Sequence, residues 1–319
     1  MSAPRPRLVP LLLTALVLSG GCARAPHSDL AAVVDGLFAL WEEADLVCLG
    51  EEHGSRADAD LRLALIADPR FAHTVDVVLL EAASPLHQDL LDRFVVEGEE
   101  LDREALRPIW LDSGLGEFWE SPVYEGLLRA LRRLNRDLPA GERVRVVAGA
   151  VPVQWDRVQA AADLVPYLDR RPFFAERARR DVLDRGLSGL AVYGVGHCAK
   201  DAEGFPSALP AAARRRVRSV LPITVRPDSA AGLTRLAPGP AARLLTLRGS
   251  AWSGEPAMDF GFAAGTRTLD EIADALVWHG EAPDEILAPR PGELPVDWRA
   301  ELDRRARLWQ EAKALPPPA

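Results

Sequence analysis

Residues 46–54 read LVCLGEEHG, and this stretch sets the fold class of the 319-residue chain. A short apolar run that ends in a glycine is typical of a strand buried on both faces of a sheet. Amphipathic helices are predicted on either side of it, over residues 29–44 and 57–67. Strands that alternate with helices of this length are the repeating unit of α/β proteins, whose central sheet is mostly parallel.

The same alternation continues along the rest of the chain. Further strands are predicted at residues 75–81, 143–149, 190–196, 220–225, 244–248 and 275–278. Further helices are predicted at residues 87–96, 103–110, 123–135, 156–168, 175–185, 209–217 and 297–313. We therefore expect one α/β domain over residues 29–314, with helices on both faces of the sheet and residues 112–122 as an insertion or lid.

Composition excludes two broad classes of protein. Hydrophobic residues make up 48% of the chain and charged residues 27%, which is typical of a folded core and excludes a disordered chain. The formal net charge is −9, so the chain lacks the basic surface that nucleic-acid binding requires. We therefore expect a small-molecule ligand and no nucleic-acid partner, whereas the sequence leaves the oligomeric state open.

The N-terminus resembles the signal peptide of a bacterial lipoprotein. Arg5 and Arg7 precede an apolar segment at residues 8–18, which is shorter than the about 20 residues of a membrane-spanning helix. Small residues then lead to Cys22, as in a lipobox. We expect residues 1–22 to be a signal peptide that directs lipidation of Cys22, with an ordinary secreted protein as the alternative.

Lipidation would hold the folded part at a membrane surface in the cell envelope. If the cell has two membranes, Ala23 resembles a signal for sorting to the outer membrane, facing the periplasm.

Two other features each have two interpretations. Cys48 and Cys198 are expected to be small buried core residues, with a disulfide between them as the alternative in an oxidising compartment. Trp110, Phe118 and Trp119 are expected to form either a second core cluster or a lid over a pocket.

Polar side chains follow three of the predicted strands. The first strand leads into Glu51, Glu52 and His53, the second ends at Glu81, and the fourth is followed by His197. The carboxyl ends of parallel strands meet at one edge of a sheet, where ligands bind in open α/β folds. Each residue alone is typical of a helix cap, an ion pair or a structural histidine, but three such segments at one edge favour a functional site.

Glu51, His53, Glu81 and His197 have the side chains that two kinds of chemistry require. Imidazoles and carboxylates bind zinc or another divalent transition metal, so the four are candidate metal ligands. Without a metal, a glutamate orients a histidine that takes a proton from water, so the same four are candidate catalytic residues. The sequence contains no HExxH, GxSxG, P-loop or GxGxxG motif.

At these residues the chain resembles the ChaN-type haem-binding lipoproteins. These are grouped with Tiki-type metalloproteases and TraB-like proteins, and more distantly with erythromycin esterases. The segments that carry the resemblance begin with LGEEHGS at residues 49–55, and the others are LLEAASPLHQDLLDRF at 79–94, the helix and strand within 123–152, and VGHCAKDAEGFPSAL at 195–209. In the esterases the histidine follows the glutamate one residue later, so the spacing here favours the ChaN and Tiki side.

The resemblance implies a lipid-anchored protein that binds haem and takes part in iron uptake, with His53 and His197 as cofactor-binding residues. The residues themselves favour an alternative, which is hydrolysis of an ester or amide. In that case His53 or a metal-bound hydroxide attacks, Glu51 or Glu81 orients the attacking group, and His197 binds or polarises the carbonyl. A third possibility is a structural lipoprotein with a degenerate site.

Overall fold

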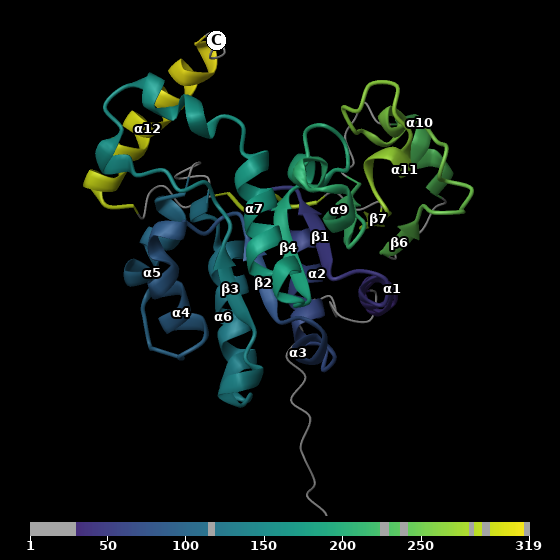
Figure 1. Ribbon diagram of the computed structural model, residues 1–319, viewed down its shortest axis with the longest axis horizontal. Coiled ribbons are helices and arrows are strands. Elements are labelled where there is room, and N and C mark those ends of the chain that lie inside the picture. Colours follow the sequence, from purple (N-terminus) through teal and green to yellow (C-terminus); the bar gives the residue numbers. More distant parts are fainter. Residues whose placement is uncertain are drawn as a thin grey trace, which may run out of the picture.

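Seven strands form one sheet in the computed structural model, with helices on both sides of it (Figure 1). The structure describes residues 30–113, 119–223, 230–236, 242–280, 284–288 and 294–315. The predicted signal peptide, Cys22 and Phe118 lie outside the described residues. Among the described helices none is long and apolar enough to cross a membrane.

The strand order is β3-β2-β4-β1-β5-β7-β6, and every neighbouring pair is parallel except β6 with β7. The prediction of a mostly parallel sheet in an α/β fold is therefore confirmed. The strands are β1 (Leu46–Glu51), β2 (Val77–Leu80), β3 (Arg145–Ala148), β4 (Gly189–Gly194), β5 (Val217–Pro222), β6 (Arg243–Thr246) and β7 (Ala275–Trp278).

The helices divide between the two faces of the sheet. One face is covered by α1 (Ala31–Trp41), α2 (Arg56–Ala67), α3 (Phe71–Thr74), α4 (Gln88–Val95), α5 (Arg103–Leu111) and α6 (Pro122–Arg136). The core on the other face includes residues of α7 (Arg171–Asp181), α8 (Val195–Cys198), α11 (Leu269–Ile272) and the long C-terminal helix α12 (Val296–Ala314). The remaining short helices are α9 (Ala211–Arg214) and α10 (Ala230–Leu233).

Two predicted helices are wrong or too long. Residues 156–168 form the 3-10 turns Trp155–Arg157 and Ala161–Tyr167 rather than an α-helix. The second turn contains Pro166, whose backbone lacks the N–H donor that an α-helix needs there. The helix predicted at residues 209–217 is only the short α9, because Val217 already begins β5.

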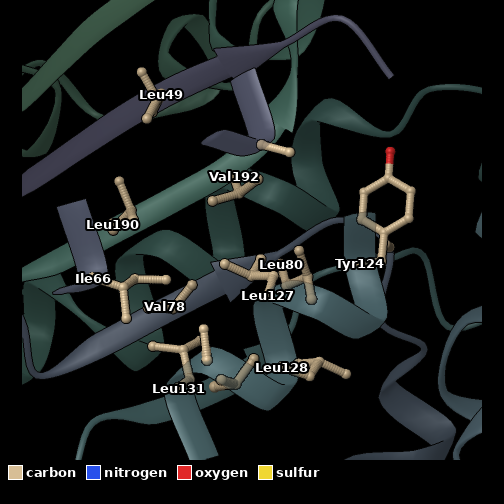
Figure 2. Close-up of a cluster of buried hydrophobic side chains, with 14 of the residues drawn as sticks. Leu49, Ile66, Val78, Leu80, Tyr124, Leu127, Leu128, Leu131, Leu190 and Val192 are labelled. Carbon is tan, nitrogen blue, oxygen red and sulfur yellow. The ribbon is translucent and has the colours of Figure 1, made fainter. Parts of the chain in front are cut away.

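Apolar packing holds the central strands against α6. Figure 2 shows aliphatic side chains of β1, β2 and β4 beside Leu127, Leu128 and Leu131 of that helix. Burying each such side chain contributes about 1.5–3 kcal/mol. Tyr124 lies at the edge of this cluster, and its hydroxyl points away from the leucines (Figure 2). The core therefore fixes the position of a polar group near the ends of the strands.

A disulfide joins Cys48 of β1 to Cys198 of α8, with their Cα atoms 5.5 Å apart. Both cysteines are fully buried, so they are core residues and disulfide partners at once. The bond ties the one-turn helix that carries His197 to the strand that leads into Glu51.

Candidate functional site

The three strands that carry the predicted site residues are neighbours in the sheet. β4 lies between β2 and β1, so the residues that follow these strands meet at one edge. Glu51 is the last residue of β1, Glu81 directly follows β2, and His197 lies in α8 directly after β4. The sequence-based expectation of a shared edge thus agrees with the observed topology.

Glu51 and His53 form a hydrogen-bonded pair. Nδ1 of His53 lies 2.9 Å from Oε1 of Glu51, which is 1% exposed, whereas the His53 side chain is 21% exposed. The chain turns at Gly54, whose φ of +80° favours glycine. Because Nδ1 is engaged by the carboxylate, Nε2 is the ring nitrogen of His53 that lies toward Gly194 at the end of β4.

Two residues that the sequence analysis missed also contact Glu51. Arg62 of α2, 1% exposed, places Nη1 2.6 Å from Oε2, and the Tyr124 hydroxyl donates a 2.8 Å hydrogen bond to Oε1. Burial alone would raise the pKa of Glu51, but the charge of Arg62 and the hydrogen bonds from His53 and Tyr124 leave that pKa below its usual value. Glu51 is therefore a buried carboxylate that stays ionised.

The environment of His53 favours its protonated form. Burial lowers the pKa of the imidazole, but the hydrogen bond and charge of Glu51 outweigh burial and leave the pKa above 6.5. The Trp119 ring packs edge-on against the imidazole, with the ring centres 4.6 Å apart. Trp119 and Trp110 are both buried in the core, which agrees with the core interpretation of these aromatic residues.

Glu81 is the second buried carboxylate of the site, at 3% exposure. Its Oε2 accepts a 2.7 Å hydrogen bond from the backbone N–H of Gly194. Its Oε1 lies 3.4 Å from Nε2 of His197 and 3.7 Å from a guanidinium nitrogen of Arg170, and it has no hydrogen-bond partner among the described residues.

His197 differs from His53 in its environment. Its side chain is 28% exposed and packs edge-on against Phe174, and its Nδ1 is buried without a hydrogen-bond partner in the described structure. Burial lowers the pKa of His197, more than the charge of Glu81 raises it. His197 is therefore neutral at pH 7, and its Nε2 faces Glu81.

Gly194 brings the two halves of the site together. A Cβ atom at this position would lie 2.8 Å from Nε2 of His53 and 3.5 Å from Oε2 of Glu81. The first distance is shorter than real Cβ contacts, so only glycine lets the imidazole lie this close to β4. His53 and Glu81, 28 residues apart, thus face the same small volume.

Glu52, the remaining predicted residue, contributes through its backbone to the turn that carries His53. Its N–H donates a 2.8 Å hydrogen bond to Asp58 of α2, whose other oxygen lies 2.7 Å from Nε2 of His279. The backbone N–H of Asp58 donates to the hydroxyl oxygen of Ser55, which caps the N-terminus of α2. These contacts anchor the turn between β1 and α2.

The described side chains of the site supply no ready set of metal ligands. No three His, Cys, Asp or Glu side chains in the described ranges are arranged to hold a metal, and the Glu51 carboxylate is already committed to Arg62, Tyr124 and His53. Haem needs an apolar slot, whereas a buried carboxylate and Arg170 lie beside His197. Haem binding therefore stays a prediction of the resemblance.

Comparison with solved structures identifies related folds. The open conformation of an erythromycin esterase mutant superposes with a TM-score of 0.55 at 12% identity, over 82% of this chain and 98% of that one. The fold is erythromycin esterase-like. A Bacillus cereus protein (TM-score 0.53, 11% identity, 82% and 95% coverage) and a succinoglycan biosynthesis protein (0.53, 12%, 80% and 92%) are also similar. No protein-family model matches the sequence, and a search of the curated proteins found no match.

Proposed function

We propose that this chain is a hydrolase of carboxylic esters or amides, in which His53 is the general base and Glu51 orients it. The observation that carries the proposal is the 2.9 Å hydrogen bond from Nδ1 of His53 to a buried, ionised carboxylate. This bond fixes the tautomer and the ring orientation, so that Nε2 is the nitrogen that accepts a proton. The likeness to an esterase fold supports the proposal.

The reaction is a single attack by water on the substrate carbonyl. Nε2 of His53 takes a proton from water while the water oxygen bonds to the carbonyl carbon, and the carbonyl π electrons move to oxygen. The tetrahedral intermediate then re-forms the carbonyl and releases an alcohol or amine, which takes the proton back from His53. Glu51 stabilises the imidazolium while it exists. His197 contacts the substrate beside Glu81.

The spacing of Glu51 and His53 supports a closer relationship of this chain to the ChaN and Tiki proteins than to the erythromycin esterases. Side-chain exposures of 21% for His53 and 28% for His197 leave both imidazoles accessible to a substrate. The charged surroundings of Glu81 favour hydrolysis over haem binding, because they place polar groups where a haem face would need apolar contacts.

The test uses the full chain, treated with EDTA, and a panel of p-nitrophenyl esters and matching anilides. We expect turnover by the wild type and a loss of about 100- to 10,000-fold in kcat/KM for His53→Ala. His73→Ala, which alters an exposed histidine of α3, is the matched control and should retain full activity. Equal turnover by His53→Ala, or no turnover by the wild type, would contradict the proposal. A Soret band that His53→Ala weakens would favour haem binding instead.

We also propose that the protein is held at a membrane surface of the cell envelope through lipidated Cys22. The Cys48–Cys198 disulfide supports this location, because disulfides persist in oxidising compartments. Expression of the full chain in a bacterium should place it in the membrane fraction, and Cys22→Ala should release it. Mass spectrometry of the mature N-terminus that finds no acyl chain on Cys22 would sink this proposal.

A further inference from the structure

The two buried carboxylates of the site each face an arginine, but at different distances. Arg62 lies 2.6 Å from Glu51 and is 1% exposed, whereas Arg170 lies 3.7 Å from Glu81 and is 16% exposed. A distance of 3.7 Å is too long for a hydrogen bond. Arg62 therefore forms a close, fully buried ion pair with its carboxylate, whereas Arg170 forms a looser ion pair in a partly exposed position.

Two contacts position the Arg170 side chain at the edge of the sheet. Arg170 immediately precedes α7, and its guanidinium lies 5.6 Å from the ring centre of Trp309 of α12. The Glu81 carboxylate is the ion-pair partner of the same guanidinium. Among the described residues no acceptor lies within hydrogen-bonding distance of the Arg170 guanidinium. The cation is thus oriented by an aromatic ring and a carboxylate but keeps its donors available.

Polar groups that lack a close hydrogen bond gather at the same spot. Oε1 of Glu81 is buried and makes no hydrogen bond to the described residues, and its nearest cationic or imidazole nitrogens are Nε2 of His197 at 3.4 Å and a guanidinium nitrogen of Arg170 at 3.7 Å. Buried polar atoms in folded proteins are hydrogen-bonded, so this carboxylate oxygen indicates a place where a bound molecule or water donates a hydrogen bond, beside the guanidinium that would receive an acceptor.

We infer that Arg170 binds the carbonyl oxygen of the substrate and stabilises the negative charge that this oxygen acquires during hydrolysis. This inference rests on the proposed function and names a residue that directly contacts the reacting group. Arg170 suits the role better than His197, because a guanidinium is permanently charged whereas burial keeps the His197 imidazole neutral. The substrate carbonyl therefore points toward the start of α7.

Charge balance supports the assignment. Before the reaction, the charges of Glu51 and Arg62 offset each other, as do those of Glu81 and Arg170. In the tetrahedral intermediate one positive charge appears on His53 and one negative charge on the former carbonyl oxygen. The first lies against Glu51, and the second lies against Arg170, so each new charge meets a fixed opposite one.

The kinetic test compares Arg170→Gln and Arg170→Lys with Arg171→Ala in the full chain. Arg171 is the neighbouring, partly exposed arginine and pairs with Asp169, so its removal should leave turnover unchanged. We expect Arg170→Gln to lower kcat by about 100- to 1,000-fold, and Arg170→Lys to lower it less because the charge remains. Free guanidinium ion should restore part of the activity of Arg170→Ala. Full kcat in Arg170→Gln would overturn the inference.

A binding test separates this inference from the proposed function. Phenylphosphonate carries tetrahedral anionic oxygens, and calorimetry reports its affinity without any turnover. We expect the wild type and Arg171→Ala to bind it equally and Arg170→Gln to bind it about 10- to 100-fold more weakly. Arginine-dependent binding without hydrolysis would overturn the proposed function, and with it the role of Arg170 in hydrolysis, and would leave Arg170 as an anion-binding residue only. If the wild type hydrolyses the esters but Arg170→Gln binds phenylphosphonate as tightly as the wild type, the inference is overturned and the proposed function stands.

Discussion

The Glu51 carboxylate contacts Nδ1 of His53 and, through its other oxygen, Nη1 of Arg62, at 2.9 and 2.6 Å. One buried anion thus connects a partly exposed imidazole to a fully buried cation on α2. The arrangement keeps the carboxylate ionised and the imidazole in one tautomer.

Arg62→Met should destabilise the fold. It leaves the Glu51 charge buried without its counterion, and removing one partner of a buried pair costs about 3–5 kcal/mol. Urea unfolding followed by circular dichroism measures the change. Arg93→Met breaks the exposed pair with Glu99 and should leave the unfolding midpoint unchanged. An equally small change in Arg62→Met would show that the ion pair is not what holds Glu51.

Gly194→Ala should abolish most of the activity without unfolding the protein. The added Cβ would lie 2.8 Å from Nε2 of His53 and displace the imidazole, and a shift of about 1 Å at a catalytic group costs about 100-fold in rate. Gly196→Ala is the matched control, since its Cβ meets no atom within 4 Å. Steady-state hydrolysis checks both variants, and full activity in Gly194→Ala would contradict the placement of His53.

Removal of the disulfide should lower stability. Replacing Cys48 and Cys198 together with alanine should cost about 2–5 kcal/mol in the free energy of unfolding, because the bond closes a loop of 150 residues. Chemical denaturation of the oxidised wild type and the double variant gives the difference. If both cysteines react with a thiol reagent in denaturant without reductant, the bond does not form in the protein.

Much of the site was predictable because its residues lie at, or just beyond, the carboxyl ends of short apolar strands. The apolar runs at these strands do not alternate with polar residues, which is typical of strands buried on both faces. Parallel strands place the residues at their carboxyl ends at one edge of the sheet, here Glu51, His53, Glu81 and His197. The sheet order, which makes β4 the neighbour of both β1 and β2, was not predictable, because strand order depends on packing between distant segments.

Arg62 and Tyr124 were missed because they lie on helices, where such residues are ordinary. A signal for Arg62 was present: Asp58, Arg62 and Leu65 recur at helical spacing, so two charged residues share the buried face of α2. Charged residues on an apolar face indicate a buried ion pair. Arg170 has no comparable signal, because it precedes α7 among several other arginines.

The most direct test of the account is the pH dependence of kcat/KM for the wild type and Glu51→Gln. His53 must be neutral to take a proton, and its pKa is raised above 6.5, so wild-type activity should fall as pH drops through a value above 6.5. Glu51→Gln removes the negative charge that raises this pKa and weakens the hydrogen bond to Nδ1, because the neutral amide oxygen is a poorer acceptor, while burial still lowers the pKa. We predict lower activity with the acid limb moved to lower pH. An acid limb at the same pH in both proteins would contradict the role of His53 as a base oriented by Glu51.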